Sequence, residues 1–244
     1  MTAARPRPAF YALRPGGWRD YVTLLHPPYT LWHLSYVAVG AALVPQMDWP
    51  LLGWTTLAFA LAMGVGAHAL DEMRGRPLQT RISPPALATL AAVSISAAAA
   101  IGIAVALSRT LWLLVFVAVG AFLVVAYNLE LFGGRFHGGL WFPAAWGAFP
   151  VLTAYFASAQ TLDAAAFAAA GYAFATSWAQ RRLSTPVRLV RRRVVAVEGQ
   201  MRLDDGTTVA LDEDSLAAEP ELALKALAAA TVLIAAALLL FRAG

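Results

Sequence analysis

Seven long apolar blocks constrain the fold of this chain more than any other feature of its sequence. Each is close to the roughly 20 residues that a helix needs to cross a hydrocarbon core about 30 Å thick. Hydrophobic residues make up 60% of the 244 residues and charged residues only 13%, about half of the share in soluble domains. The blocks therefore predict an all-α polytopic transmembrane bundle of about seven spans, at residues 29–44, 51–70, 86–107, 111–127, 140–157, 164–179 and 222–241.

The basic residues are distributed unevenly between the two sides that these spans define. If the N-terminus is cytoplasmic, sixteen of the 18 lysines and arginines fall in cytoplasmic segments, and only Arg109 and Arg242 fall outside. Such an excess is the usual mark of the cytoplasmic side in helical membrane proteins. We therefore expect a multi-pass protein of the inner (cytoplasmic) cell membrane with a cytoplasmic N-terminus. Contact with anionic lipids then accounts for the net charge of +4, and nothing in the sequence points to nucleic acid.

One segment between the last two spans has a different character. Residues 181–221 start with a run of arginines, continue as VVAVEGQMRL, DDG and TTVALD, and end in an acidic patch. Branched residues on both sides of an Asp-Gly turn are typical of a β-hairpin. The hairpin, near residues 194–211, is either a solvated insert on the membrane face or a lid over a cytoplasmic opening. The expected organisation is a cytoplasmic arm (1–24), a bundle of six spans (25–180), a basic cytoplasmic linker with a small β-hairpin (181–221) and a last transmembrane helix (222–244).

Ionisable side chains gather at the expected cytoplasmic ends of several spans. The stretch GAHALDEMRGRPL ends the second span and spaces His68, Asp71 and Glu72 as i, i+3 and i+4, which share one helical face. Carboxylates suit Mg²⁺, which often bridges to substrate phosphates, and arginines clamp a diphosphate with paired donors. Ionisable groups at membrane depth are costly and indicate function by default. The further candidates are Arg76 and Arg81 in the next loop, Tyr127 and Asn128 after the fourth span, and Arg181 and Arg182 after the sixth.

Each of these residues also has an ordinary structural interpretation. Asp71 and Glu72 could be the water-exposed end of a helix and pair with nearby arginines. His68 could make a structural hydrogen bond to a neighbouring helix. The arginines could all be topology signals and contacts to lipid headgroups. Tyr127 and Asn128 could be an interfacial anchor and a helix-end cap.

Four segments resemble the UbiA-type family of intramembrane prenyltransferases. AHALDEMRGRPL, which ends in Arg76-Pro77-Leu78, is similar to the family's first acidic motif, N-D-x-x-D-x-x-x-D, with the R-P dipeptide that commonly follows it. AYNLELFGGRFHGG resembles the tyrosine-bearing loop after the fourth helix, and WGAFPVLTAYFA resembles the fifth helix. SWAQRRLSTPVR falls where the second acidic motif ends the sixth helix. The resemblance covers residues 25–190.

The chain departs from the family pattern at both acidic motifs. With Asp71 in the place of the second aspartate, Ala67 and His68 replace the asparagine and the first aspartate, and Gly75 falls where the third is expected. The sixth-helix motif has no acid, and Gln180 and two arginines stand there instead. Cationic side chains can replace a metal electrostatically at a diphosphate. The family usually has nine helices, against about seven here.

The resemblance implies an enzyme that transfers a prenyl group from an isoprenoid diphosphate to an acceptor at a cytosol-facing intramembrane site. It implies Asp71, Glu72 and Tyr127 as catalytic residues, with both carboxylates on Mg²⁺, and membrane lipids as further partners. The substrate-binding residues that it implies are His68, Arg76, Arg81, Asn128, Arg181 and Arg182. Two alternatives stay open: a non-catalytic UbiA-like protein that binds a polyprenyl lipid or quinone, and a small transporter.

Overall fold

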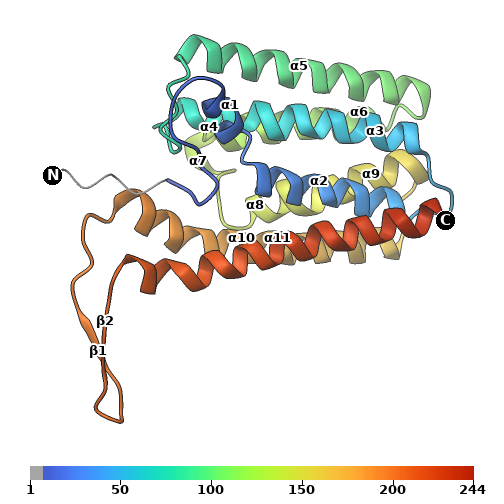
Figure 1. Ribbon diagram of the computed structural model, residues 1–244. Coiled ribbons are helices and arrows are strands. Elements are labelled where there is room, and N and C mark those ends of the chain that lie inside the picture. The colour runs from blue at the N-terminus through green and yellow to red at the C-terminus, as the bar shows by residue number, and fades with distance from the viewer. Residues whose placement is uncertain (1–7) are drawn as a thin grey trace.

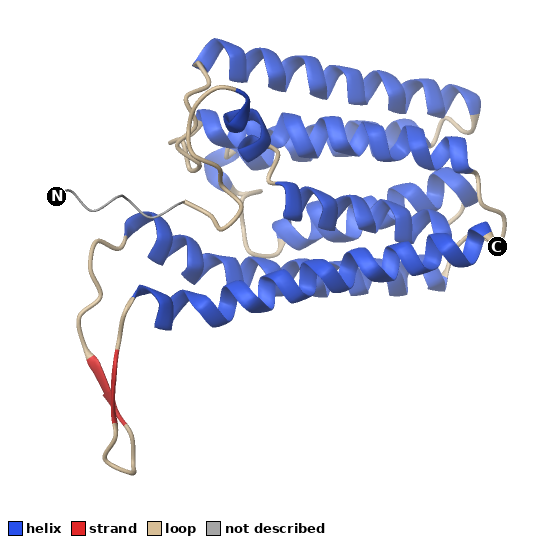
Figure 2. Ribbon diagram, viewed as in Figure 1, coloured by secondary structure: helices blue, strands red, loops and turns tan. Residues whose placement is uncertain are grey.

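The computed structural model describes residues 8–244, and this part of the chain is mostly helical (Figures 1 and 2). Residues 1–7, with Arg5 and Arg7 of the expected N-terminal arm, lie outside the described residues. Each of the seven ranges expected to be an apolar helix does contain one. The elements are α1 (Trp18–Leu24), α2 (Pro27–Ala42), α3 (Trp49–Phe59), η1 (Ala60–Ala67), α4 (His68–Met73), α5 (Pro84–Ser108), α6 (Leu113–Asn128), α7 (Leu131–Gly134), α8 (Trp141–Pro143), η2 (Ala144–Ala148), α9 (Phe149–Ala159), α10 (Ala164–Arg193), β1 (Gln200–Arg202), β2 (Thr208–Ala210) and α11 (Glu213–Ala243).

Two of the long helices contain a π-helical segment. In η1 and η2 the backbone winds more widely than in an α-helix, and each segment continues directly into the helices on both sides. Thus α3, η1 and α4 form one helix, and α8, η2 and α9 form another. Such segments are rare and occur frequently at functional sites.

Local sequence signals account for where several helices begin. The carboxylate of Asp48 accepts a hydrogen bond from Leu51 N (2.9 Å) at the start of α3, and Asp163 does the same at α10. Prolines lie in the first turn of α2, α3 and α5, where no backbone N–H is needed. Asp212 and Ser215 form a capping box at the start of α11.

The sixth long helix is longer than the sequence suggested. We expected it to end near residue 179, but α10 continues through Pro186 to Arg193, so its basic residues are helical and not part of a linker. The reason is tertiary packing, because Ser184, Val187 and Val190 are buried along one face at helical spacing. The last helix also begins earlier than expected, at Glu213.

The long helices lie side by side in a bundle (Figure 1). Helix α11 packs against α2 and α10, α2 packs against α9, and α5 packs against η1, α4 and α6. Trp32 and Tyr36 of α2 form a fully buried cluster with Val151 and Ala173. The short helices α1, α4 and α7 and the β-hairpin lie at one end of the bundle, and the C-terminus lies at the other.

Glycines allow two of these helix pairs to approach closely. A methyl group at Gly40 of α2 would lie 2.3 Å from the carbonyl oxygen of Val151, and one at Gly147 of η2 would lie 2.4 Å from that of Ala173. Both neighbours are backbone atoms, which cannot rotate away. Small residues at such contacts are a common feature of helix packing in membranes.

We expect Gly147→Ala to lower the free energy of unfolding by about 1–3 kcal/mol, because η2 and α10 must separate to admit the methyl group. Gly171→Ala is the matched control: it lies on α10, and the added methyl group meets no atom within 4 Å. Thermal unfolding of the purified protein in detergent measures both changes. Equal unfolding midpoints for the two variants would contradict this account of the contact.

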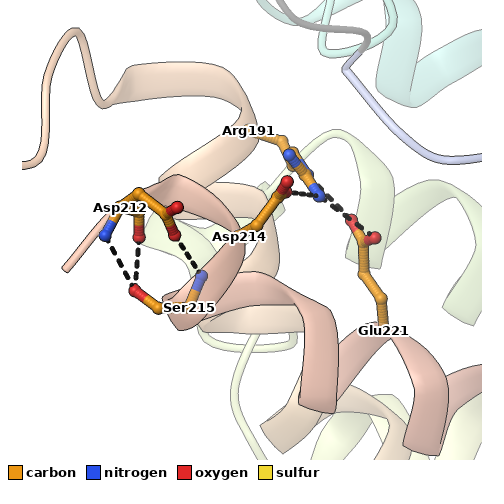
Figure 3. A network of polar contacts seen from close by, with 5 residues as sticks. All are labelled: Arg191, Asp212, Asp214, Ser215 and Glu221. Carbon is orange, nitrogen blue, oxygen red and sulfur yellow. Dashed lines mark hydrogen bonds and ion pairs between the residues drawn. The ribbon is translucent and has the colours of Figure 1, made fainter. Parts of the chain in front are cut away.

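An ion-pair network joins the C-terminal end of α10 to the N-terminal end of α11 (Figure 3). Arg191 donates from Nε to Glu221 (2.9 Å) and from Nη2 to Asp214 (3.1 Å). Beyond this network, β1 and β2 pair antiparallel, with Met201 opposite Val209, which confirms the expected hairpin. All six strand residues are exposed, so the hairpin extends away from the bundle (Figure 1).

In the described part of the chain, three helices are long and apolar enough to cross a membrane. They are the helix Trp49–Met73, α5 and α11, and α6 is apolar but shorter. Large apolar side chains such as Leu107, Trp112, Leu240 and Phe241 are exposed on the bundle surface. Exposed apolar surface of this kind is expected where lipid, and not water, surrounds a protein. The structure is therefore compatible with a membrane protein.

Candidate functional site

A polar cavity of about 300 Å³ lies at the end of the bundle that carries α4 and α7. Segments far apart in the sequence form its wall: residues 8–11, the start of α2, the η1–α4 junction, the ends of α6 and α8, and α10. Its charged lining consists of Asp71, Arg74, Arg181, Arg188 and Arg192. All four histidines of the chain also line it, namely His26, His33, His68 and His137.

Five of the residues singled out from the sequence meet in this cavity. They are His68, Asp71, Tyr127, Asn128 and Arg181. Arg181 Nη1 donates to the hydroxyl of Tyr127 (2.7 Å), which joins α10 to the C-terminal end of α6. The side chain of Asn128 donates to Val124 O (2.7 Å), a bond within α6. These five residues, from α4, α6 and α10, therefore line one cavity.

Glu72 is not among the residues that line the cavity. It is fully buried, and its two carboxylate oxygens accept hydrogen bonds from Leu78 N (3.0 Å), Thr80 N (2.9 Å) and Thr80 Oγ1 (2.9 Å). Glu72 thus holds the loop after α4 in place. Asp71, its neighbour in sequence, lines the cavity instead.

Three arginines of the expected site also lie elsewhere. Arg76 Nη1 donates to Thr80 O (2.9 Å) and Ile82 O (2.8 Å), so it folds the same loop that Glu72 holds. Arg81 is exposed, and its backbone N–H donates to Asp20 (2.9 Å). Arg182 is exposed and lies over the ring of Trp178, 5.2 Å from its centroid.

Sequence reasoning missed Arg188 and Arg192 as parts of the site. With Arg181 they are spaced i, i+7 and i+11, which places all three on one face of a helix. That signal was present in the sequence, but it has meaning only if the helix continues past residue 179. His137 and Tyr11 were also missed, because no local pattern indicates that their loops fold over the cavity.

Three histidines are held in the same way. The Nδ1 atoms of His33, His68 and His137 lie within 2.8–3.0 Å of the backbone carbonyl oxygens of Trp146, Gly64 and Tyr127. A carbonyl only accepts, so Nδ1 carries the proton and the lone pair of Nε2 is left free. The three rings therefore supply hydrogen-bond acceptors and potential proton acceptors.

The fourth histidine, His26, precedes α2 and bonds to the N-terminal segment. Its Nδ1 lies 2.6 Å from the hydroxyl of Tyr11, and its ring stacks on His68 with centroids 4.1 Å apart. Burial lowers the pKa of His26 well below its usual range, and the neighbouring His68 adds to this effect. Burial likewise raises the pKa of the Tyr11 hydroxyl. Both groups are therefore neutral near pH 7.

The donor set of the cavity does not fit the Mg²⁺ expected from the resemblance. Among the described residues no group of three or more histidines, aspartates or glutamates is placed to hold a metal ion. Asp71 is the single carboxylate in the described lining, which also contains four arginines, and Glu72 is committed to the loop. A divalent cation held by one carboxylate and surrounded by guanidinium groups is electrostatically unfavourable.

A second, apolar cavity of about 120 Å³ adjoins the polar one. It lies between α3–η1, α5, α6 and α9, and its wall includes Phe59, Ile95 and Phe116. Met63 and Trp146 line both cavities, so the two cavities adjoin at these side chains. A polar chamber next to an apolar one fits an amphiphilic ligand.

No protein-family model matches this chain, and no curated protein or solved structure is significantly similar to it.

Proposed function

We propose that this chain is a UbiA-like prenyltransferase that spans the inner cell membrane about seven times, with a cytoplasmic N-terminus. In this proposal the polar cavity opens toward the cytoplasm and receives an isoprenoid diphosphate from the membrane. Three helices meet the usual length and apolarity for a span. The other four proposed spans are shorter helices that lie beside these three in the bundle: α2, α6, α8–α9 and the first half of α10.

The single observation that carries the proposal is the convergence of Asp71, Tyr127 and Arg181 on one cavity that borders an apolar chamber. Those three residues come from the three segments that resemble the family's acidic motifs and tyrosine loop. The arginines suit the diphosphate and the apolar chamber suits the prenyl chain. Met63 and Trp146 line both spaces, so a ligand with its head group in one and its chain in the other would lie beside these two side chains.

The chemistry follows from the groups in the polar cavity. The bond between the first prenyl carbon and the diphosphate oxygen breaks, and both electrons remain on that oxygen, where guanidinium groups stabilise the negative charge. The faces of Tyr127, Phe142 and Trp146, which line the cavity, stabilise the allylic cation. The nucleophilic atom of the acceptor then bonds to the same carbon and loses a proton to Asp71.

A test uses purified protein and labelled geranyl, farnesyl and geranylgeranyl diphosphates with a panel of aromatic acceptors. We expect a prenylated product and one diphosphate released per product. Arg181→Gln is expected to lower the rate by about 10-fold or more, through the loss of a charged hydrogen bond to the leaving group. Arg182→Gln, its exposed neighbour in sequence, is the matched control and should keep the wild-type rate.

A non-catalytic binder of a polyprenyl lipid is the second candidate. The observation that favours it is the single carboxylate in the described lining, because prenyl transfer in the resembled family relies on several. Tight binding of the labelled diphosphates with no product for any acceptor would support the binder and overturn the transferase. Failure to bind any of them would overturn both.

A further inference from the structure

We infer that the cavity holds a phosphorylated head group through the arginine face of α10, without a divalent cation. The inference rests on the proposed function for the identity of the ligand, a phosphorylated isoprenoid. It goes beyond that proposal by assigning the phosphate to the arginine face of α10 and by stating that binding needs no divalent cation.

The charge balance of the cavity is the first observation. Arg181, Arg188 and Arg192 lie on one face of α10, and all three line the cavity. The fourth arginine, Arg74, pairs with Glu130 (3.3 Å) outside it. Only Asp71 brings negative charge to the described lining, so the chamber has a clear excess of positive charge. Such a site attracts a phosphate and repels Mg²⁺.

The hydrogen bonds of the three arginines leave donors available. Arg181 uses Nη1 for the Tyr127 hydroxyl (2.7 Å) and Nη2 for His137 O (3.4 Å), and Arg192 uses Nε for Pro8 O (3.1 Å). Within residues 8–244, Arg188 makes a single long side-chain hydrogen bond of 3.4 Å, to Thr185 one turn earlier in its own helix. Each guanidinium carries five N–H donors in a planar fork that matches phosphate oxygens. Arg188 thus has the most donors free for a ligand.

Gln180, at the start of the same face, provides an independent observation. Its side chain is 3% exposed, it lines the cavity, and its Oε1 has no hydrogen-bond partner among the described residues. A buried polar atom left without a partner destabilises the folded protein, and a ligand that supplies the partner removes this cost. The two ends of the amide exchange on rotation about the side chain, so Gln180 can either donate to a phosphate oxygen or accept from a phosphate hydroxyl.

Three of the four histidines in the lining already use one ring nitrogen. Nδ1 of His33, His68 and His137 donates to a backbone carbonyl oxygen, so that N–H is not available to a ligand. The guanidinium groups of α10 are therefore the main donors that remain for a phosphate oxygen.

The test measures binding of farnesyl diphosphate by calorimetry to protein in phosphatidylcholine nanodiscs, once with EDTA and once with Mg²⁺. We expect the same affinity in both, and competition by inorganic pyrophosphate in EDTA. Arg188→Gln should weaken binding about 10- to 100-fold, as for loss of hydrogen bonds to a charged group. Arg193→Gln removes the same charge from an exposed position next to the site and should bind as the wild type does.

The outcomes separate this inference from the proposed function. Binding and turnover that require Mg²⁺ would overturn the inference and leave the transferase standing. Binding in EDTA with no turnover would support the inference and overturn the transferase.

Equal weakening in Arg188→Gln and Arg193→Gln would show general surface attraction and overturn the inference. Displacement of the ligand by phosphatidylglycerol vesicles, but not by pyrophosphate, would also overturn it, because a lipid headgroup would then be the ligand. The EDTA comparison needs no variant, so it holds even if Arg188→Gln misfolds.

Discussion

Asp71→Asn is expected to slow prenyl transfer by about 100-fold or more, which is the usual loss when a general base is removed. Asp71 is the single carboxylate in the described lining of the polar cavity, so it is the group best suited to take the proton that the acceptor loses. The side chain makes no hydrogen bond to another described residue, and asparagine has nearly the same shape. The fold should therefore survive, and the initial rate with farnesyl diphosphate measures the effect.

The matched control is Asp204→Asn, in the exposed hairpin, where the same chemical change lies outside the site. It should leave the rate unchanged. Thermal unfolding of both variants should follow that of the wild type. A wild-type rate for Asp71→Asn would remove this residue from the mechanism, and the free Nε2 atoms of the histidines would then be the remaining proton acceptors.

Glu72→Ala is expected to lower the free energy of unfolding by about 3 kcal/mol or more. Asp71→Asn, in contrast, should lower the rate and leave the stability unchanged. Three donors, Leu78 N, Thr80 N and Thr80 Oγ1, lose their acceptor in a fully buried place, and each costs about 1–3 kcal/mol when left unpaired. This is a large share of the 5–15 kcal/mol that typically separates folded from unfolded proteins. Thermal unfolding in detergent, together with the yield of folded protein, measures the loss.

Glu130→Ala serves as the comparison for this change. Glu130 pairs with Arg74, but its side chain is 43% exposed, and exposed ion pairs contribute only about 0–1 kcal/mol. Its unfolding midpoint should stay near that of the wild type. If Glu72→Ala instead unfolds normally and loses only Mg²⁺-dependent activity, then Glu72 is the metal ligand that the resemblance implied, and the structural role is wrong.

The helices and the hairpin were predictable because their signals are local. The length of each apolar block indicates a helix, and a proline or an aspartate marks where several helices begin. The Asp-Gly turn marks the hairpin. Each of these signals lies within the segment that it predicts. The end of α10 was not predictable in this way. The proline at position 186 argues against a continuing helix, and the run of arginines argues against a continuing membrane span. Burial of Val187 and Val190 on one face shows why the helix continues.

The candidate site was predictable to the extent that its groups lie at helix ends on one side of the bundle. The sequence did not predict which of the adjacent acids, Asp71 or Glu72, lines the cavity. Successive side chains on a helix differ in direction by about 100°, so only one of the two can point there. The side chains of Glu72 and Arg76 make hydrogen bonds to backbone atoms of the loop at residues 74–83, so these two residues turn toward the loop and not toward the cavity. Loop conformations of this kind depend on hydrogen bonds that no periodic pattern shows.

The π-helical segment η1 lies immediately before His68 and Asp71. Each hydrogen bond of a π-helix spans one residue more than that of an α-helix. The direction in which the side chains of α4 point therefore depends on the length of the η1 segment, residues 60–67. Removal of a single residue there would restore a regular helix and swing the carboxylate of Asp71 toward a different neighbour. In comparisons among related chains, a one-residue gap at this place would therefore mark a change of chemistry, even where the HALDEM stretch itself is identical.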